Sequence, residues 1–283
     1  MKSVELVNVS FAYPNGFVAV EDVSMSFEAG ESVAIIGQNG AGKTTTVKMM
    51  NNLYQPTSGT VFVSGEDTKR FTTAQVARKV GYVFQNPDDQ IFQSEVQKEV
   101  AYSSKVNKVP KDVAQKWFDF AIELTGLGNQ LDENPYNLPL SIRKFVTIAS
   151  VIALNPDVVI LDEPTAGQDL MGINLLSHAI KALKDLGKTV ITITHDMDFV
   201  TDNFERVIVM ANKKKIADGS VKSVFWDASV MEKAALKQPS ICALASKLHL
   251  PGGIITEDEF IETIKDRCKI NDKTEILSLS LRV

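Results

Sequence analysis

Residues 37–44 read Gly-Gln-Asn-Gly-Ala-Gly-Lys-Thr and match the pattern G-x-x-x-x-G-K-[ST] of a phosphate-binding loop. Its glycines let the backbone curl so that N–H groups point inward, where they can cradle the α- and β-phosphates of a nucleotide. Lys43 can reach the β- and γ-phosphates, and the Thr44 hydroxyl can bind Mg²⁺. The predicted nucleotide-binding residues of this loop are Gly37, Asn39, Gly40, Ala41, Gly42, Lys43, Thr44 and Thr45.

The sequence on either side of the loop has the context that such a site needs. Residues 32–36 form a short apolar run that is typical of a strand, and residues 45–50 continue as a helix. The N-terminus of that helix presents its positive end to the same anion. A glycine-rich turn without function would need neither neighbour, so we expect a working phosphate site.

Composition limits the class of protein more loosely. Of 283 residues, 44% are hydrophobic and 23% charged, as in ordinary soluble globular proteins. The formal net charge of −5 disfavours a nucleic-acid binder, which usually has a basic face. Cys242 and Cys268 lack metal-ligand spacing and are predicted to be free thiols in a reducing compartment. The sequence predicts neither a cleavable signal nor a membrane span, for which about 18 apolar residues are needed.

Strand and helix patterns alternate along most of the chain. Two alternating strands are expected within residues 1–30, and two short strands near 207–210 and 215–217 flank a basic turn that is predicted to be a solvated hairpin tip. This order predicts an α/β fold with a mainly parallel sheet. Buried strands are predicted over 32–36, 80–84, 158–161 and 190–194, and helices over 95–126, 141–153 and 172–186.

The pattern changes after about residue 220. Residues 220–267 contain short helical pieces broken by prolines and glycines, and residues 275–281 alternate leucine with serine in the manner of a strand. We therefore divide the chain into a nucleotide-binding domain, residues 1–219, and a small C-terminal domain, residues 220–283.

Two adjacent carboxylates, Asp162 and Glu163, end the apolar run 158–161. A strand of a parallel sheet delivers such side chains to the edge where nucleotides bind in α/β folds. Asp162 is predicted to hold Mg²⁺ through water, and Glu163 to polarise the attacking water. The alternative is that Asp162 and Glu163 are only solvated acids at the end of a strand. The presence of the phosphate-binding loop disfavours this alternative.

Two further polar residues follow predicted strands. His195 comes directly after residues 190–194, and Gln85 ends the run 80–84. A lone histidine or glutamine is more often structural, but the position of each after a strand of this sheet favours contact with the γ-phosphate for His195 and with Mg²⁺ and water for Gln85. The predicted catalytic residues are thus Lys43, Gln85, Glu163 and His195, and the predicted metal-binding residues are Thr44, Gln85 and Asp162.

Taken in order, these elements resemble the nucleotide-binding subunits of ABC transporters, over residues 1 to about 220. The resemblance implies an antiparallel β subdomain and a helical subdomain, about residues 88–155, added to a P-loop ATPase core. It also implies that Tyr13 stacks on adenine, for which a flat aromatic ring is suited, with Val20 packing nearby. Asp169, in the run Ala-Gly-Gln-Asp at 166–169, would lie in a loop that touches the opposite subunit.

A narrower resemblance involves residues 84–92, Phe-Gln-Asn-Pro-Asp-Asp-Gln-Ile-Phe. This segment is similar to one in the ATPases of energy-coupling-factor (ECF) transporters and related cobalt importers, as are residues 223–225, 241–245 and 248–251. The resemblance implies an importer of vitamins or transition-metal ions, built from two ATPases, a scaffold membrane protein and a small substrate-binding membrane protein. It further implies that residues 220–283 help the ATPases to dimerise.

The family signature, Leu-Ser-Gly-Gly-Gln at the start of the helix before Asp162, is degenerate in this chain. The spacing to Asp162 and the apolar pattern of residues 146–149 set the register. A second register, with residues 140–141 on Leu-Ser, shifts the helix by two residues and is disfavoured. In the favoured register the signature positions hold Leu138, Pro139, Leu140, Ser141 and Ile142.

This change affects what the chain offers to the ATP of the opposite subunit. Pro139 has neither hydroxyl nor N–H, and Leu140 puts a side chain where the family has bare backbone. Each donor lost at a transferring phosphoryl group costs on the order of 2.7–4 kcal/mol, by analogy with oxyanion-hole deletions. The helix dipole and Arg143 are expected to substitute in part. Because the P-loop side is complete, we expect an asymmetric heterodimer with a second ATPase that has an intact signature.

The sequence thus predicts an ATP-binding and ATP-hydrolysing subunit of an ECF-type importer, with ATP and Mg²⁺ as cofactors. We expect it on the cytoplasmic face of the membrane, held there by partners, with the scaffold docked on residues 85–97 and on the helical segment after them. Two alternatives remain: a non-catalytic ATP-binding partner subunit, against which Glu163 and His195 argue, and a soluble ABC ATPase of DNA repair or translation. The single P-loop and the net negative charge argue against a soluble ABC ATPase.

Overall fold

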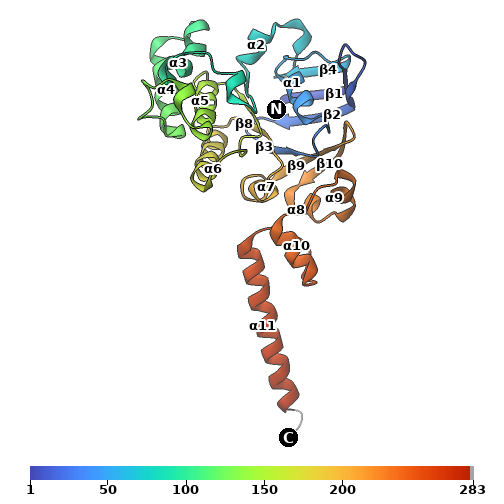
Figure 1. The fold of residues 1–283 in the computed structure, drawn as a ribbon. Helices are drawn as coiled ribbons and strands as arrows, with labels where there is room; N and C mark the ends of the chain where they lie inside the picture. The colour runs from blue at the N-terminus through green and yellow to red at the C-terminus, as the bar shows by residue number, and fades with distance from the viewer. Residues whose placement is uncertain (281–283) are drawn as a thin grey trace.

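The computed structural model describes the backbone of residues 1–280 and the side chains of residues 1–268. Within that range, two sheets and the helices around them form one body, and a long C-terminal helix projects from it (Figure 1). Helices α3, α4, α5 and α6 gather on one side of the body, and the antiparallel strands β1, β2 and β4 lie on the other.

The smaller sheet is antiparallel, with strand order β2-β1-β4-β5. Alternating residues of its two long strands are buried, including Val4 and Leu6 of the first and Val23 and Met25 of the second. This pattern is typical of a sheet with one face on a core. The strands are β1 (Lys2–Ala12), β2 (Val18–Glu28), β4 (Ser58–Val63) and β5 (Glu66–Asp67).

The larger sheet has the order β10-β9-β3-β8-β7-β6, in which every neighbouring pair is parallel except the hairpin of β9 and β10. Every residue of β3, β8, β7 and the edge strand β6 is buried, as expected for parallel strands covered on both faces. The predicted mainly parallel α/β sheet is confirmed. Its strands are β3 (Ser32–Ile36), β6 (Val80–Val83), β7 (Val158–Asp162), β8 (Thr189–Ile193), β9 (Arg206–Ala211) and β10 (Lys214–Ser220).

The helices follow the predicted pattern, and the region 95–126 divides into two helices at Pro110, which precedes α4. Three-residue 3₁₀ turns cover Thr68–Arg70, Pro87–Asp89 and Pro135–Asn137. The α-helices up to the end of the larger sheet are α1 (Lys43–Met50), α2 (Thr73–Ala77), α3 (Val96–Val106), α4 (Lys111–Thr125), α5 (Leu140–Ile152), α6 (Leu170–Asp185) and α7 (Met197–Asn203).

The two faces of the larger sheet belong to different cores. Within β3, Val33 and Ile35 pack into the core shared with the antiparallel sheet and α1, whereas Ala34 and Ile36 pack into the core under the helices. The alternation of side chains along a strand makes this division. The carboxyl ends of the strands therefore open at the junction of a β layer and a helical layer.

The C-terminal region contains α8 (Val221–Phe225), α9 (Ala228–Ala234), α10 (Ser240–Lys247) and α11 (Glu257–Ser280). Residues of α8 and α9 pack into the core under the helices, while Ala245, Leu250 and Ile254 form a separate small cluster. The domain boundary at residue 220 and the limits of the helical subdomain stay predictions.

The strand expected over residues 275–281 is wrong for residues 275–280, which continue α11; Leu281 lies outside the described residues. Leucine–serine alternation favours a strand locally, but here the segment continues a helix that begins at Glu257.

Candidate functional site at the carboxyl edge of the parallel sheet

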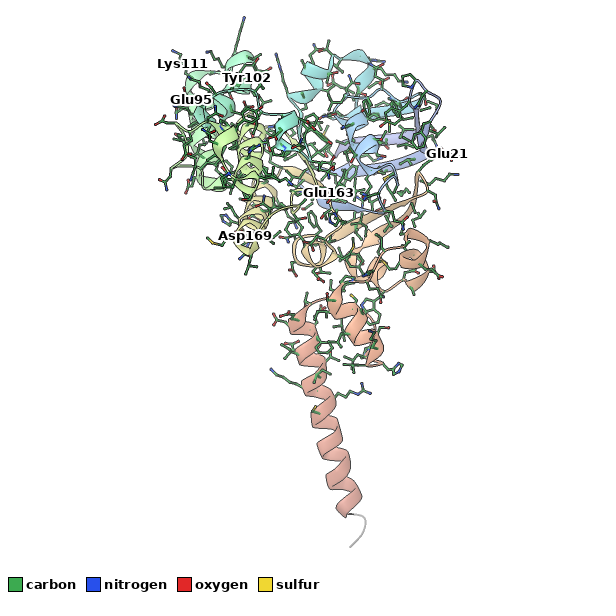
Figure 2. The ribbon with its side chains drawn as sticks, viewed as in Figure 1. Glu21, Glu95, Tyr102, Lys111, Glu163 and Asp169 are labelled. Atoms are coloured by element: carbon green, nitrogen blue, oxygen red, sulfur yellow. The ribbon has the colours of Figure 1, made fainter. Side chains whose placement is uncertain are left out.

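The carboxyl ends of β3, β6, β7 and β8 meet at one edge of the larger sheet, as the register shows. Ile35 pairs with Ile193, and Asp162 also pairs with Ile193, so the residues that follow these strands emerge together. In open α/β sheets this edge is where ligands bind. Figure 2 shows Glu163 in the middle of the body, at the junction of its two halves. The edge carries the phosphate-binding loop, Gln85, Asp162, Glu163 and His195.

The phosphate-binding loop is held in a shape that requires its glycines. Gly37 has φ 151°, and a Cβ at this position would lie 2.1 Å from the carbonyl oxygen of Met210. Gly42 has φ 97°, and a Cβ there would lie 2.6 Å from the carbonyl oxygen of Ala19. Helix α1 begins directly after Gly42, so its free N–H groups face the loop. The loop is therefore built as an anion cradle.

A cavity of about 260 Å³ lies over this loop. Lys43 extends along its floor, and its Nζ donates to the carbonyl oxygens of Gly37, at 2.6 Å, and Gln38, at 3.0 Å. Burial lowers the pKa of Lys43, and the charges of Glu163 and Asp162 oppose that effect. A phosphate would supply the charge that this buried ammonium needs. The lining residues are Tyr13, Phe17, Ala19, Asn39, Gly40, Ala41, Gly42, Lys43, Thr44, Thr45, Gln85 and Glu163.

The predicted metal-binding residues come together beside the cavity. The Thr44 hydroxyl donates to Asp162 Oδ1 at 3.4 Å, and Gln85 lines the same cavity. Tyr82, which the sequence did not single out, donates from its hydroxyl to Asp162 Oδ2 at 2.6 Å. Burial and then the Asp162 charge raise the pKa of Tyr82, so it stays a donor. A carboxylate, a hydroxyl and an amide oxygen fit Mg²⁺, which otherwise keeps water and phosphate ligands.

Glu163 and His195 form a close pair. His195 Nδ1 lies 2.7 Å from Glu163 Oε2, and the backbone N–H of Glu163 donates to the carbonyl oxygen of Ile193 at 2.9 Å. Glu163 has φ 49°, a left-handed conformation that few non-glycine residues adopt. This turn directs the carboxylate into the cavity that the phosphate-binding loop forms.

At the other end of the cavity lies a cluster of aromatic rings. The Tyr13 hydroxyl lies 3.3 Å from Thr45 Oγ1, and its ring meets those of Phe11 and Tyr54 edge-on at 5.0 Å and 5.9 Å. Tyr13 is thus anchored where a base joined to the bound phosphates would lie. Its predicted stacking on adenine stays a proposal.

The prediction for Val20 needs correction. Val20 is fully buried behind the loop, so it does not line the cavity, and Ala19 lines it instead. Phe17 also lines the cavity, and its ring is 54% exposed and lies 6.3 Å from that of Tyr13. The ammonium of Lys213 lies 4.8 Å from the Phe17 ring, so the basic turn reaches this end of the cavity. The sequence feature that could have identified Phe17 is its position as an aromatic residue directly after the Pro-Asn-Gly turn.

The degenerate signature begins α5 as expected from the favoured register. Pro139 caps the helix without a side-chain hydrogen bond, Leu138 is buried, and Leu140 is exposed. The Ser141 carbonyl oxygen accepts from Gln168 Nε2 at 3.1 Å. The N-terminus of α5 therefore presents proline and leucine side chains, in place of a serine hydroxyl and bare backbone.

Arg143 does not substitute for the lost signature groups, contrary to expectation. Its Nη1 pairs with Asp88 Oδ1 at 2.5 Å, and its Nη2 donates to the carbonyl oxygens of Tyr136 and Leu138. The side chain is 16% exposed. These bonds hold the guanidinium on acceptors of its own subunit beside the start of α5.

Asp169 lies at the start of α6 (Figure 2). Its Oδ1 accepts from the Gly172 N–H at 2.8 Å, which is an ordinary helix N-cap. The next residues, Leu170 and Met171, are 76% and 81% exposed, and Leu140 on the neighbouring helix is 51% exposed. Large apolar side chains so exposed beside a cap are typical of an interaction surface.

A phosphate-binding loop facing an Asp-Glu pair and a histidine at the ends of parallel strands, with an antiparallel sheet alongside, defines an ATP-binding cassette. A protein-family model described as ABC transporter matches residues 20–166. The chain belongs to the ABC transporter family and carries its ATPase domain.

Individual relatives support the narrower resemblance. A putative ABC transporter ATP-binding protein of Clostridium acetobutylicum is 38% identical over 93% of this chain and 95% of its own length. An energy-coupling factor transporter ATP-binding protein of Caldanaerobacter subterraneus is 37% identical, over 91% of this chain and 96% of its own. The chain spans only 45% and 44% of two relatives from Methanosarcina mazei and Methanosarcina acetivorans.

Among solved structures, the chain is similar to cbiO1 of Clostridium perfringens, described as part of the ABC transporter complex cbiONQ. The TM-score is 0.74 and the identity 30%, over 88% of this chain and 99% of the other. The resemblance to ABC ATPases of the ECF group is confirmed.

Proposed function

We propose that this chain is an ATP-binding and ATP-hydrolysing subunit of an ECF-type importer and that it works in an asymmetric pair with a second ATPase. The contrast between two faces of the chain carries the proposal. On the P-loop face, Lys43, Thr44, Gln85 and Glu163 line one cavity, and Glu163 and His195 lie 2.7 Å apart, whereas α5 begins with an exposed Leu140 after Pro139.

On the P-loop face, the residues fit the hydrolysis of a phosphoanhydride by water. The loop N–H groups would hold the α- and β-phosphates, and Lys43 would hold the β- and γ-phosphates. Glu163, inside the cavity, accepts a hydrogen bond and then a proton from the attacking water, while His195 fixes its orientation. Mg²⁺, held by Thr44, Asp162 and Gln85, would neutralise charge on the phosphates. Positioning and electrostatics supply most of the catalysis in such reactions.

The degenerate signature at the start of α5 would make a homodimer of this chain a poor ATPase. In the arrangement that the family resemblance implies, each ATP lies between one P-loop and the signature of the other subunit. A partner with an intact signature would complete the site on this chain's P-loop. This chain would leave the site on the partner's P-loop degenerate.

The proposed membrane partners follow from the ECF relatives and from one exposed surface. Phe92 and Tyr102, 57% and 38% exposed, lie edge-on with ring centroids 4.5 Å apart (Tyr102 is labelled in Figure 2). Beside them is a cavity of about 230 Å³ that Leu53 and Phe84 also line. Exposed aromatic side chains around a hollow favour protein docking. Gln90 and Phe92, of the predicted scaffold-binding residues 85–97, line this cavity.

The proposed location is the cytoplasmic face of the membrane, through partners. None of the helices within residues 1–280 combines the length and hydropathy of a membrane span. The proposed transported substrate is a vitamin or a transition-metal ion, as the resemblance to ECF and cobalt importers implies; another subunit would select it.

The first experiment is gentle detergent co-purification of a tagged chain from its native membranes, with mass spectrometry of the bound proteins. A second ATPase with an intact signature, together with small membrane proteins, is the expected result. Recovery with soluble partners only would overturn the importer. Phe92→Ala with Tyr102→Ala should release the membrane proteins while ATP binding is retained.

A second experiment separates this function from that of a non-catalytic partner. Glu163→Gln keeps the size of the side chain and removes its basicity, so it should abolish turnover of the purified complex. Unchanged turnover, with ATP still bound, would show that hydrolysis occurs elsewhere and that this chain only binds nucleotide.

A further inference from the structure

Lys144 is a buried cation for which the proposed chemistry has no role. It lies on α5, two residues after the degenerate signature, and is 2% exposed. Its Nζ donates to the carbonyl oxygen of Glu163 at 2.8 Å and to that of Ala166 at 2.9 Å. The side chain thus joins α5 to the loop that follows β7.

Burying an ammonium is unfavourable unless polar groups surround it. Burial lowers the pKa of Lys144, while the charges of Glu163 and Asp162 raise it and so oppose that effect. The two carbonyl oxygens and the two carboxylates supply the negative field that the ammonium needs. This environment is specific to the segment that carries Glu163.

The Glu163 backbone needs such support. Its φ of 49° places a non-glycine residue in the left-handed region, which costs roughly 1–2 kcal/mol. The N–H of Glu163 donates to the Ile193 carbonyl oxygen at 2.9 Å, and the Glu163 carbonyl oxygen accepts a long bond from the Ala166 N–H, at 3.3 Å. The bond of 2.8 Å from Lys144 to this carbonyl oxygen is shorter than the one from Ala166. A donor on the carbonyl side therefore restrains the peptide that aims the Glu163 carboxylate.

We propose that Lys144 is a positioning residue for Glu163: its ammonium holds the carbonyl oxygens of Glu163 and Ala166 and thereby keeps the Glu163 carboxylate directed at the γ-phosphate side of the cavity. The inference rests on the proposed function of Glu163. Lys144 does not itself line the cavity, and the one lining residue among the two that its ammonium bonds to is Glu163, so it acts through Glu163.

The same contact connects the two faces of the subunit. Helix α5 begins with the degenerate signature, and Gln168 of the loop donates to the Ser141 carbonyl oxygen at 3.1 Å. Lys144 and Gln168 together fasten the N-terminal half of α5 to residues 163–168. A displacement of α5 at the partner's ATP is thus transmitted to the Glu163 peptide of this chain's own site.

The test compares Lys144→Met with a matched control in the complex recovered from membranes. Lys188→Met is that control, because burial also lowers the pKa of Lys188. The Lys188 Nζ donates to the Asn155 carbonyl oxygen at 3.4 Å. Lys188 directly precedes β8, at the end of that strand opposite to Glu163. We expect Lys144→Met to lower kcat about 10- to 100-fold, in the range of lost positioning groups, with the ATP dissociation constant unchanged within about twofold. Lys188→Met should leave both unchanged.

Two further variants keep the inference falsifiable if Lys144→Met folds poorly. Lys144→Gln retains a donor without the charge and should recover part of kcat. In a His195→Ala background, where turnover is lowered but still measurable, Lys144→Met should cause a loss smaller than additive, because both substitutions act on the orientation of Glu163. Additive losses would instead assign Lys144 an independent role.

The outcomes that overturn the inference are distinct from those that overturn the function. If Glu163→Gln leaves turnover intact, the function of Glu163 fails, and the inference fails with it. If Glu163→Gln abolishes turnover and Lys144→Met behaves like Lys188→Met, only the inference fails. A parallel fall in ATP affinity and kcat would show a general structural role. Hydrogen exchange of amides 163–169 should rise in Lys144→Met and not in Lys188→Met.

Discussion

His195 Nδ1 lies 2.7 Å from Glu163 Oε2, although the two side chains differ greatly in exposure. The His195 side chain is 68% exposed and that of Glu163 only 9%. The histidine therefore stands on the rim of the cavity and holds a carboxylate that is inside it. The pair joins the ends of adjacent strands β7 and β8, so its geometry depends on the sheet itself.

Replacing His195 with alanine should leave ATP bound and slow its hydrolysis. The Glu163 carboxylate would lose its partner and with it one preferred orientation toward the attacking water. We expect kcat to fall about 100-fold, the lower end of general-base effects. Turnover and ATP affinity of the complex measure this, and His195→Gln, which retains a polar group, should lose less. A fall in affinity as large as the fall in kcat would contradict an orienting role.

Tyr82→Phe should affect the metal more than the nucleotide. The hydroxyl of Tyr82 donates to Asp162 Oδ2 at 2.6 Å, and Asp162 is 2% exposed. Removing this donor leaves a buried carboxylate oxygen unpaired, and hydrogen bonds to charged groups contribute about 1.5–3 kcal/mol to stability. We expect a lower melting temperature and a higher Mg²⁺ concentration at half-maximal turnover. A Mg²⁺ requirement equal to that of the unchanged protein would show that Tyr82 only supports the fold.

The sequence alone was sufficient to predict that the polar side chains at the strand ends come together. Each of Gln85, Asp162, Glu163 and His195 directly follows an apolar run that forms a strand of the parallel sheet, so chain order alone predicts their convergence. The glycines of the loop were equally informative, because the Cβ clash at Gly37 excludes other residues.

Side-chain contacts between residues far apart in the chain could not be predicted from the sequence. Tyr82 lies inside a strand, Lys144 inside a helix, and each meets its partner only through packing, 80 and 19 residues apart in the chain. Arg143 failed as a substitute for the same reason, since its partner Asp88 is 55 residues away. The misassigned strand over 275–280 had a different cause, because leucine–serine alternation favours a strand locally, whereas the segment continues the long helix α11.

Phe17 should contribute to the recognition of the base. Its exposed ring faces the cavity beside Tyr13, and a base stacked on an aromatic side chain is worth about 1–3 kcal/mol in single-stranded nucleic-acid binding. We expect Phe17→Ala to weaken ATP binding about fivefold or more, at the low end of that range. Inorganic tripolyphosphate, which has no base, should bind the variant and the unchanged protein equally. Equal losses for both ligands would mean that Phe17 supports the loop instead, and Phe17→Tyr serves as the conservative control.

The two cysteines should differ sharply in reactivity. Burial raises the pKa of Cys242 to about 11, and its thiol donates to the Ile254 carbonyl oxygen, whereas Cys268 is exposed. At pH 8 the thiolate fraction of Cys242 would be about 0.1%, so alkylation should modify Cys268 alone. Mass spectrometry after iodoacetamide treatment checks this, and Cys268→Ser should be unlabelled until the protein is denatured. Rapid labelling of native Cys268→Ser would show that α10 opens from the small cluster beneath it.

Restoring the signature should convert a poor homodimer into a better ATPase. The variant Pro139→Ser, Leu140→Gly, Ser141→Gly and Ile142→Gln supplies a hydroxyl, bare backbone and an amide where α5 now begins with proline and leucine. One recovered donor at a transferring phosphoryl group is worth on the order of 2.7 kcal/mol, or about 100-fold, so a rise of at least about tenfold in kcat is expected even with imperfect geometry. Turnover of the purified chain without its partner measures the gain.

Two controls make that result decisive. The added glycines weaken the first turn of α5 by about 1 kcal/mol each, so the melting temperature must show that the restored variant is still folded at the assay temperature. Adding Glu163→Gln to the restored variant should remove the gain, because the new signature acts on ATP that the chain's own catalytic carboxylate must hydrolyse. A folded, ATP-binding variant with no gain would mean that the degenerate signature is not what limits the homodimer, and the asymmetric pair would lose its physical basis.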